Sequence, residues 1–140
     1  MNVIVVDAQG GGIGKLLVAG LKKALPEALV WAVGTNAAAT GAMLKAGADR
    51  AATGENAVLV ACRSADLILG PIGIVIADSL YGEITPAMAA AVGQSGARRI
   101  LIPFDQCDNY VPGCAELPLA VRIQAAVDKA AELVSGGKNS

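Results

Sequence analysis

The chain of 140 residues contains no histidine. Histidine is the usual general base near neutral pH and a frequent metal ligand. Its absence excludes nucleophilic catalysis by Ser-His-Asp and Cys-His arrangements, and it excludes zinc sites that depend on imidazole. Whatever this protein does, it does without an imidazole.

Aromatic residues are also scarce, at 3% of a chain that is 54% hydrophobic. The core must therefore consist mainly of Ala, Val, Ile and Leu, a composition typical of parallel strands that helices cover on both faces. This much apolar material is more than a small monomer hides comfortably. We therefore expect a homo-oligomer, most simply a dimer, formed through an aliphatic helix face.

Neither sign of charge dominates, because 11 Lys and Arg stand against 12 Asp and Glu. The basic residues form no stripe between aromatics, so nucleic-acid binding has little support. The first apolar run ends at Asp7 without a signal-peptide pattern, and no run approaches the ~18 residues of a membrane helix. Three cysteines are an odd count and indicate no disulfide framework. We expect a cytoplasmic protein with no membrane partner.

Short β-rich runs alternate with segments of helical period. Strands are predicted at residues 2–6, 29–33, 66–69 and 99–103, and helices at 13–25, 36–46, 53–64, 85–92 and 118–134. Residues 72–80 are ambiguous, since their isoleucines alternate as in a strand; a helix there keeps the β-α rhythm. The rhythm predicts a three-layer, Rossmann-like α/β domain with a mainly parallel sheet of four to five strands. In this prediction residues 1–134 form a single domain and 135–140 a loose tail.

A glycine-rich segment, D-A-Q-G-G-G-I-G-K at residues 7–15, joins the first predicted strand to the first helix. Glycines permit positive φ and close approach of a ligand to the backbone, and the helix N-terminus supplies N–H donors and the positive end of a dipole. We expect a ligand phosphate there, with Gly10, Gly11, Gly12, Gly14 and Lys15 as binding residues. The alternative is that the glycines only form a tight turn and let helix and strand pack closely.

The segment departs from each named phosphate-binding fingerprint. Lys15 stands at the third glycine of G-x-G-x-x-G, while Gln9 and Leu16 replace the first glycine and the magnesium-binding hydroxyl of the Walker A pattern. Ala8 replaces the first glycine of the short-chain dehydrogenase pattern, and the Y-x-x-x-K motif of those enzymes is absent. Triphosphate hydrolysis by the P-loop mechanism and hydride transfer by that route are therefore disfavoured. A dinucleotide is compatible with the sequence but not required by it.

Other residues follow the predicted strands. Thr35 and Asn36 come after the second strand, and Gly70 and Gly73 after the third. In parallel α/β sheets, ligands bind outside the carboxyl ends of the strands, where such loops meet. We expect these residues to converge with the glycine-rich segment and with Pro103, Phe104 and Asp105 at the end of the fourth strand. We expect Thr35, Asn36, Gly70 and Gly73 to help bind a nucleotide or another small phosphate-bearing molecule.

Three residues are candidates for a catalytic group: Asp78, Glu83 and Cys107. Either carboxylate could act as a general base if it faces the crevice, although capping and surface roles explain lone carboxylates more often. Cys107 has no base partner, which favours an incidental thiol over a nucleophile. Its spacing from Cys114 does not suit a zinc site, so no metal is predicted.

Several motifs occur together along the chain: V-V-D-A-Q-G-G-G-I-G-K, V-G-T-N-A, M-L-K-A-G-A-D, A-T-G-E-N-A, G-P-I-G-I-V-I-A-D-S-L and I-L-I-P. In combination they resemble the bacterial family known as domain of unknown function 3842, over nearly the whole chain. The resemblance implies a small, cytoplasmic, Rossmann-like protein. It implies no activity, because none is assigned to that family.

Two classes of function stay open at this point. The first is a nucleotide-binding or phosphate-ligand-binding module without chemistry of its own. The second is an enzyme that acts on a small phosphorylated or nucleotide substrate. The missing histidine and the lack of a complete catalytic constellation favour the first.

Overall fold

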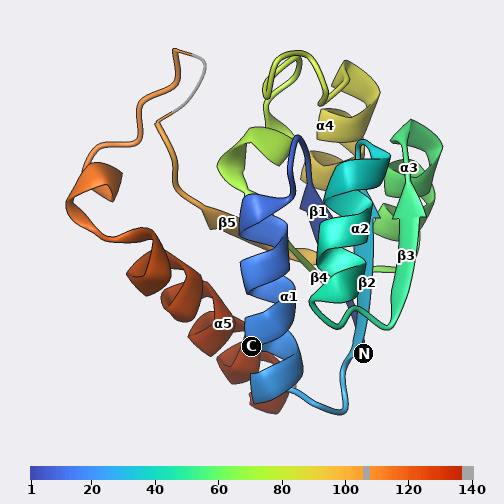
Figure 1. Ribbon diagram of the computed structural model, residues 1–140, viewed down its shortest axis with the longest axis vertical. Coiled ribbons are helices and arrows are strands. Elements are labelled where there is room, and N and C mark those ends of the chain that lie inside the picture. The colour runs from blue at the N-terminus through green and yellow to red at the C-terminus, as the bar shows by residue number, and fades with distance from the viewer. Residues whose placement is uncertain (106–107, 137–140) are drawn as a thin grey trace.

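The computed structural model describes residues 1–105 and 108–136. Within these residues, five parallel strands form one sheet in the order β3-β2-β1-β4-β5. The strands are β1 (Asn2–Asp7), β2 (Leu29–Gly34), β3 (Arg50–Thr53), β4 (Leu67–Pro71) and β5 (Arg98–Ile102). Helices flank the sheet on both sides, which confirms the prediction of a three-layer, Rossmann-like α/β fold (Figure 1).

The helices divide into two groups, one on each face of the sheet. One face packs against α1 (Gly12–Ala24), α2 (Ala37–Lys45) and α5 (Leu119–Ser135), which lie in front in Figure 1. The other packs against α3 (Glu55–Ser64), α4 (Pro86–Gln94) and the short 3-10 helix η1 (Ile72–Val75). A second 3-10 turn, η2 (Cys114–Glu116), precedes α5. None of the helices in the described ranges is long and apolar enough to cross a membrane.

The central strand β1 supplies both halves of the core. Its side chains alternate between faces, so Val3 and Val5 pack under α1 and α5 whereas Ile4 and Val6 pack under α3 and α4. All four residues are at most 1% exposed. A strand buried on both faces reads as a continuous apolar run, which is why the sequence identifies it so clearly.

Two helix starts follow from local chemistry. The Asn36 side chain accepts a hydrogen bond from the N–H of Ala39 and caps α2, as predicted. Thr85 caps α4 in the same way through Met88, with Pro86 at the first helical position. The two capped helices begin after the carboxyl end of β2 and after the loop that follows β4, respectively.

The structure differs from the predicted elements in two places. The predicted strands omit β3, an edge strand that pairs with β2 alone and exposes three of its four residues, so it carries no apolar pattern. Helix α3 begins at Glu55, after this strand, and not at Thr53. The helix favoured for residues 72–80 is limited to the single turn of η1, because the chain then turns through residues in the left-handed region, Asp78 and Leu80 among them.

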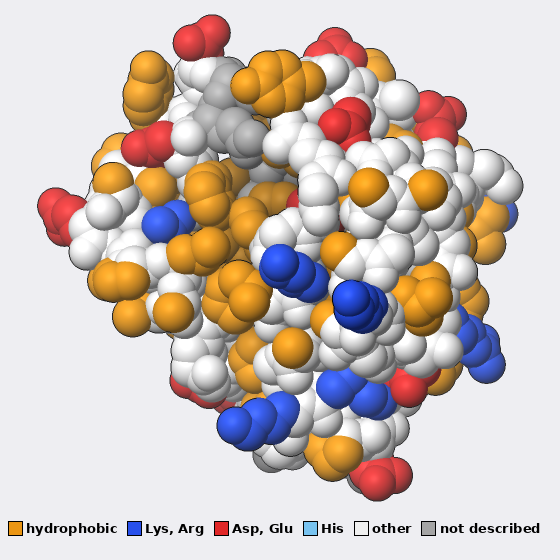
Figure 2. Space-filling model, in the orientation of Figure 1, with side chains coloured by type: hydrophobic (Ala, Val, Ile, Leu, Met, Phe, Trp, Pro, Cys, Tyr) orange, Lys and Arg blue, Asp and Glu red, His pale blue; other side chains and the backbone are white. Residues whose placement is uncertain are grey.

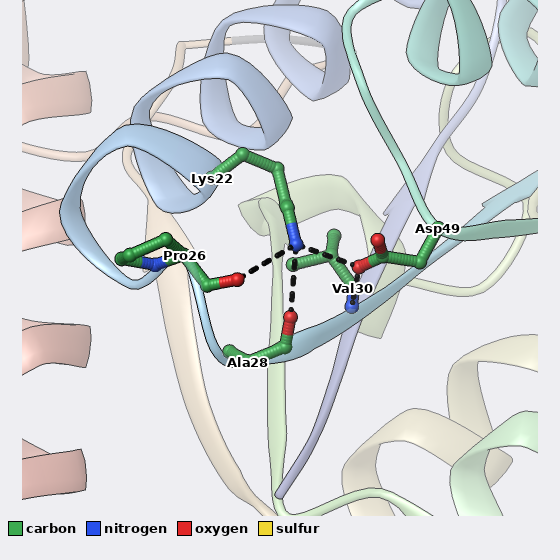
Figure 3. Close-up of polar contacts among 5 residues, drawn as sticks. All are labelled: Lys22, Pro26, Ala28, Val30 and Asp49. Atoms are coloured by element: carbon green, nitrogen blue, oxygen red, sulfur yellow. Dashed lines mark hydrogen bonds and ion pairs between the residues drawn. The ribbon is translucent and has the colours of Figure 1, made fainter.

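The amino edge of the sheet is held by a small polar cluster (Figure 3). The ammonium of Lys22 pairs with Asp49 at 2.9 Å and donates to the carbonyls of Pro26 and Ala28. The same Asp49 oxygen accepts the N–H of Val30, and this bond together with Lys22 holds the pKa of Asp49 below its ordinary value. These bonds hold the last turn of α1 to the starts of β2 and β3 at this edge.

The described part of the predicted tail begins inside a helix. Helix α5 ends at Ser135, the first residue of the segment predicted as a loose tail. Residues 137–140 lie outside the described residues.

Candidate functional site

A cavity of about 300 Å³ opens at the carboxyl ends of β1 and β4. These strands are neighbours in the sheet, yet the chain leaves β1 toward α1 on one face and β4 toward α4 on the other. Such a reversal leaves a crevice between the two diverging loops, where ligands of open α/β sheets bind. The sequence prediction that the loops converge at this edge is consistent with this geometry.

The polar side of the cavity is the glycine-rich segment itself. Asp7, Gln9, Gly10 and Gly12 line it. Gly11 adopts a left-handed conformation (φ +71°), and its N–H donates to the carbonyl of Ala8, which turns the chain sharply into α1. Helix α1 therefore begins with its first N–H groups next to the cavity.

Asp7 is the one buried carboxylate at this edge among the described residues, with only 5% of its surface exposed. Its two oxygens accept the N–H groups of Ala8 at 2.8 Å and Gly14 at 2.6 Å. Burial raises the pKa of Asp7 above its ordinary value; the N–H groups of Gly14, Ala8 and Ile13 oppose this rise, and the negative charge of Glu83 adds to it. The segment thus carries its own anion at the start of α1.

The glycines of this segment fall into two classes. A Cβ at Gly11 would lie 2.9 Å from the carbonyl oxygen of Ala39, and one at Gly14 would lie 2.5 Å from Sδ of Met43. The fold itself needs these two glycines, for conformation at Gly11 and for space at both. A Cβ at Gly10 or Gly12 would meet nothing within 4 Å, and neither residue has positive φ.

Glu83 ties three loops together at the same edge. Its Oε1 accepts the N–H of Gln9 at 3.0 Å, the hydroxyl of Thr35 at 2.6 Å and the side-chain amide of Asn36 at 2.8 Å. Asn36 also donates to the carbonyl of Gln9. Burial alone would raise the pKa of Glu83, but the hydrogen bonds from Thr35, Gln9 and Asn36 outweigh it and hold the pKa below its ordinary value. The carboxylate holds Gln9, which lines the cavity, to the loop that follows β2.

The other side of the cavity is apolar. It is formed by Ile13, Pro71, Leu80, Phe104 and Leu119. Figure 2 shows a hollow lined largely by hydrophobic side chains between the start of α1 and the segment that joins β5 to α5. The cavity is therefore amphipathic, with backbone and carboxylate on one side and hydrocarbon on the other.

The structure separates the residues predicted for the site. Thr35 and Asn36 are not among the described residues that line the cavity; Asn36 donates to the carbonyl of Gln9, which does line it. The side chain of Lys15 lines a groove between α1 and α2 instead. Gly70 and Gly73 are not among the described residues that line the cavity, and packing explains them: a Cβ at Gly70 would collide with the carbonyl oxygen of Val6.

The three catalytic candidates have different outcomes. Glu83 is not among the described residues that line the cavity, but it accepts the N–H of Gln9, which does line it. Asp78 is exposed in a turn with φ +64°, where its N–H donates to the carbonyl of Ile84. Cys107 lies outside the described residues. The expected convergence of strand ends included Asp7 and Phe104, without a binding role for either, and it did not include Leu119.

The two described cysteines are buried. Burial raises the pKa of the Cys62 thiol to about 11, which fits the predicted core role and an inert thiol. Cys114 donates to Asp105 at 3.4 Å, and burial with this carboxylate raises the pKa of its thiol. Over the described residues, no group of three or more His, Cys, Asp or Glu could hold a metal ion.

Comparison with known proteins identifies the family. Residues 2–135 match the family described as Domain of unknown function (DUF3842). The chain belongs to this family. No curated protein sequence matches it. The family match confirms the resemblance seen in the sequence motifs and assigns no activity.

Two solved structures are similar to this DUF3842 protein at low sequence identity. One is a dodecameric FMN-dependent Ubix-like decarboxylase from Escherichia coli O157:H7, with 18% identity, a TM-score of 0.45 and coverage of 92% of this chain and 75% of that one. Another is AibC, with 19% identity, a TM-score of 0.44 and coverage of 97% of this chain; the matched part is 39% of AibC.

Proposed function

We propose that this DUF3842 protein binds a small phosphate-bearing ligand, most simply a nucleotide, with the phosphate against the backbone at Gly10 and Gly12. The ligand lies in the cavity at the ends of β1 and β4. The N–H groups at the start of α1 and the positive end of its dipole favour an anion at this position.

The supporting observation is the difference between the four glycines of the segment. Gly11 and Gly14 are explained by turn conformation and packing, which the turn-only interpretation requires. Gly10 and Gly12 are explained by neither, yet both line the cavity. A glycine that the fold does not need, placed at a cavity wall, is what close approach of a ligand to the backbone demands.

The size of the cavity favours a compact ligand. Its volume of about 300 Å³ is at the lower end of the range of ~300–1,000 Å³ typical of ligand sites. A mononucleotide or another small phosphate ester suits this volume better than a dinucleotide. The dinucleotide-dependent alternative therefore loses support.

The carboxylates near the cavity favour a binding function over catalysis. Both oxygens of Asp7 accept backbone N–H groups, and Oε1 of Glu83 holds three loops in place. A general base must reach the proton that it abstracts, and these carboxylates are engaged in shaping the site. An enzyme on a phosphorylated substrate would have to release one of them first.

The test compares two matched substitutions, Gly12→Val and Gly41→Val. Both glycines are exposed and helical, and a Cβ at either meets nothing within 4 Å, but only Gly12 lines the cavity. Both variants should fold, because valine is no worse than glycine in a helix. Thermal-shift and calorimetric titrations with nucleoside monophosphates should show binding by the wild type and by Gly41→Val.

For Gly12→Val we expect at least about a tenfold loss of affinity, which corresponds to about 1.4 kcal/mol. At 100-fold excess over its Kd, a bound nucleotide should stabilise the wild type by about 2.7 kcal/mol, an easily measured shift. A folded Gly12→Val protein that binds with unchanged affinity would contradict the proposed position of the phosphate.

A further inference from the structure

We infer that the ligand carries a planar aromatic ring, as a nucleobase does, and that this ring packs against Phe104 in the apolar half of the cavity. The inference rests on the proposed function and narrows it. The proposed phosphate site by itself is compatible with nucleotides, sugar phosphates and inorganic phosphate. The inference selects nucleotides among these three classes of ligand.

The apolar half of the cavity is assembled from separate elements. Pro71 ends β4, Leu80 comes from the loop before α4, and Leu119 begins α5. A sugar phosphate that filled this half would bury hydroxyl groups against hydrocarbon without hydrogen-bond partners, which is unfavourable. A flat ring buries apolar area there without that penalty.

Phe104 is the single phenylalanine of the chain, and it lines this cavity. The guanidinium of Arg122 lies over its ring, 4.8 Å from the ring centre. Arg122 is itself held by the carbonyls of Pro103 at 2.9 Å and Leu117 at 3.0 Å. The ring is thereby fixed in place before any ligand arrives, so little conformational entropy is lost when a second ring packs on it.

The two halves of the cavity set the chemistry of the ligand. The backbone at Gly10 and Gly12 binds the anionic group of the ligand on one side of the cavity, and the side chain of Phe104 contacts the ring of the ligand on the other. Both lie in one cavity of about 300 Å³, so a single small molecule must carry both groups. A nucleoside monophosphate has this composition, with the ribose as the spacer.

The first experiment uses the wild-type protein and a ligand series. Calorimetric affinities are measured for ribose 5-phosphate and for AMP, GMP, CMP and UMP at one pH and salt concentration. Stacking of a base on an aromatic side chain implies that at least one nucleotide binds about 5- to 150-fold more tightly than ribose 5-phosphate. If ribose 5-phosphate binds as tightly as the best nucleotide, the inference is overturned and the proposed phosphate site stands. If none of the five binds, the proposed function fails as well.

The second experiment removes the ring. Phe104→Leu keeps an apolar side chain, and Tyr110→Leu is its control, since Tyr110 lies in the same connection, is 78% exposed and is not among the described cavity-lining residues. In Phe104→Leu, the best nucleotide should bind no more tightly than ribose 5-phosphate. The affinity for ribose 5-phosphate itself should stay unchanged. Tyr110→Leu should keep both the preference for the nucleotide and the affinity for ribose 5-phosphate, as should Phe104→Trp, which retains a ring.

Equal nucleotide preference in Phe104→Leu and wild type would overturn the assignment to Phe104. Should Phe104→Leu fail to fold, the comparison of wild type with Phe104→Tyr decides. A tyrosine ring keeps the platform, so the preference for the nucleotide must persist within about threefold; its disappearance in a folded Phe104→Tyr protein would contradict ring packing at this position.

Discussion

The carboxylate of Asp7 accepts the N–H of Gly14 at 2.6 Å, so the end of β1 is bonded to the first turn of α1 across the glycine-rich segment. In its ionised form, this side chain occupies the position at which the helix attracts anions. A ligand phosphate bound at Gly10 and Gly12 would have to share this environment with Asp7. Among the described residues lining the cavity, no cationic side chain offsets that charge.

Binding of a phosphate ligand should therefore depend on the protonation of Asp7. Because burial raises the pKa of Asp7, its negative charge is lost earlier on acidification than that of an ordinary Asp, and repulsion of the ligand falls as pH falls. Asp7→Asn should raise the affinity for AMP at pH 8 by about tenfold or more, since two charges ~5 Å apart interact by about 3 kcal/mol at intermediate dielectric.

The measurement is a titration with AMP between pH 8 and pH 4.5 for both proteins. The phosphate itself gains a proton near pH 6, so the pH dependence that Asp7→Asn retains belongs to the ligand. Identical pH profiles for wild type and Asp7→Asn would show that Asp7 does not act on the ligand.

Glu83 should contribute stability that disappears in acid. A carboxylate with a depressed pKa stabilises the fold above its unfolded value, here the ordinary 4.5, and loses this contribution as pH falls through the lower folded value. At pH 7, Glu83→Ala should cost about 1–3 kcal/mol, because the N–H of Gln9 and the side chains of Thr35 and Asn36 lose their acceptor.

Glu83→Gln is the matched control for the charge. The carbonyl oxygen of the glutamine can still accept the same hydrogen bonds, but neutral hydrogen bonds are about half as strong as those to a charged group. The Glu83→Gln variant should therefore lose roughly half as much stability as Glu83→Ala. Urea unfolding at pH 7 and pH 4 measures both. If the difference in the free energy of unfolding between wild type and Glu83→Gln is as large at pH 4 as at pH 7, the role of the charge is contradicted.

Gly14→Ala and Gly12→Ala should differ in their effect on stability. A Cβ at Gly14 would lie 2.5 Å from Sδ of Met43 and 2.9 Å from Cβ of Asp7, so overpacking should cost about 1–3 kcal/mol. At Gly12 the new methyl meets nothing within 4 Å, and alanine should stabilise the helix by about 0.5–1 kcal/mol. Thermal unfolding of the ligand-free proteins gives both values. Equal effects would mean that the packing around Gly14 is looser than described.

A substitution at Tyr81 should relieve backbone strain in the loop before α4. This residue has φ +57° and is 89% exposed, so its side chain adds little packing to offset a left-handed backbone. Asparagine tolerates this conformation better, and Tyr81→Asn should stabilise the protein by up to about 1 kcal/mol in urea unfolding. A loss of stability would show that the tyrosine makes contacts that offset the strain.

The homo-oligomer stays a prediction. Leu16 and Leu44 are 41% and 50% exposed on the neighbouring helices α1 and α2, in agreement with the expected apolar helix face. Light scattering should give at least twice the 14.0 kDa mass of the chain at micromolar concentration. A particle of the mass of one chain throughout that range would rule it out.

Much of the fold could be predicted because its elements carry local signals. β1 is a continuous apolar run, and Asn36 and Thr85 cap their helices through bonds to residues three positions on. β3 could not be predicted in the same way, because an exposed edge strand needs no apolar pattern and its pairing with β2 is a tertiary contact. The turn after η1 likewise depends on left-handed residues that no composition rule selects.

By itself, the sequence determined the parallel α/β fold class and the position of a glycine-rich segment between the first strand and helix, since both follow from period and local chemistry. Only the tertiary structure decided which glycines are free to meet a ligand, because the space beside Gly11 and Gly14 is filled by Ala39 and Met43 of another helix. It also decided that the cavity pairs this segment with Phe104, almost a hundred positions away in the chain. The sequence predicts that a parallel sheet gathers the ends of these strands at one edge, but only tertiary packing selects which residues of those ends face the cavity.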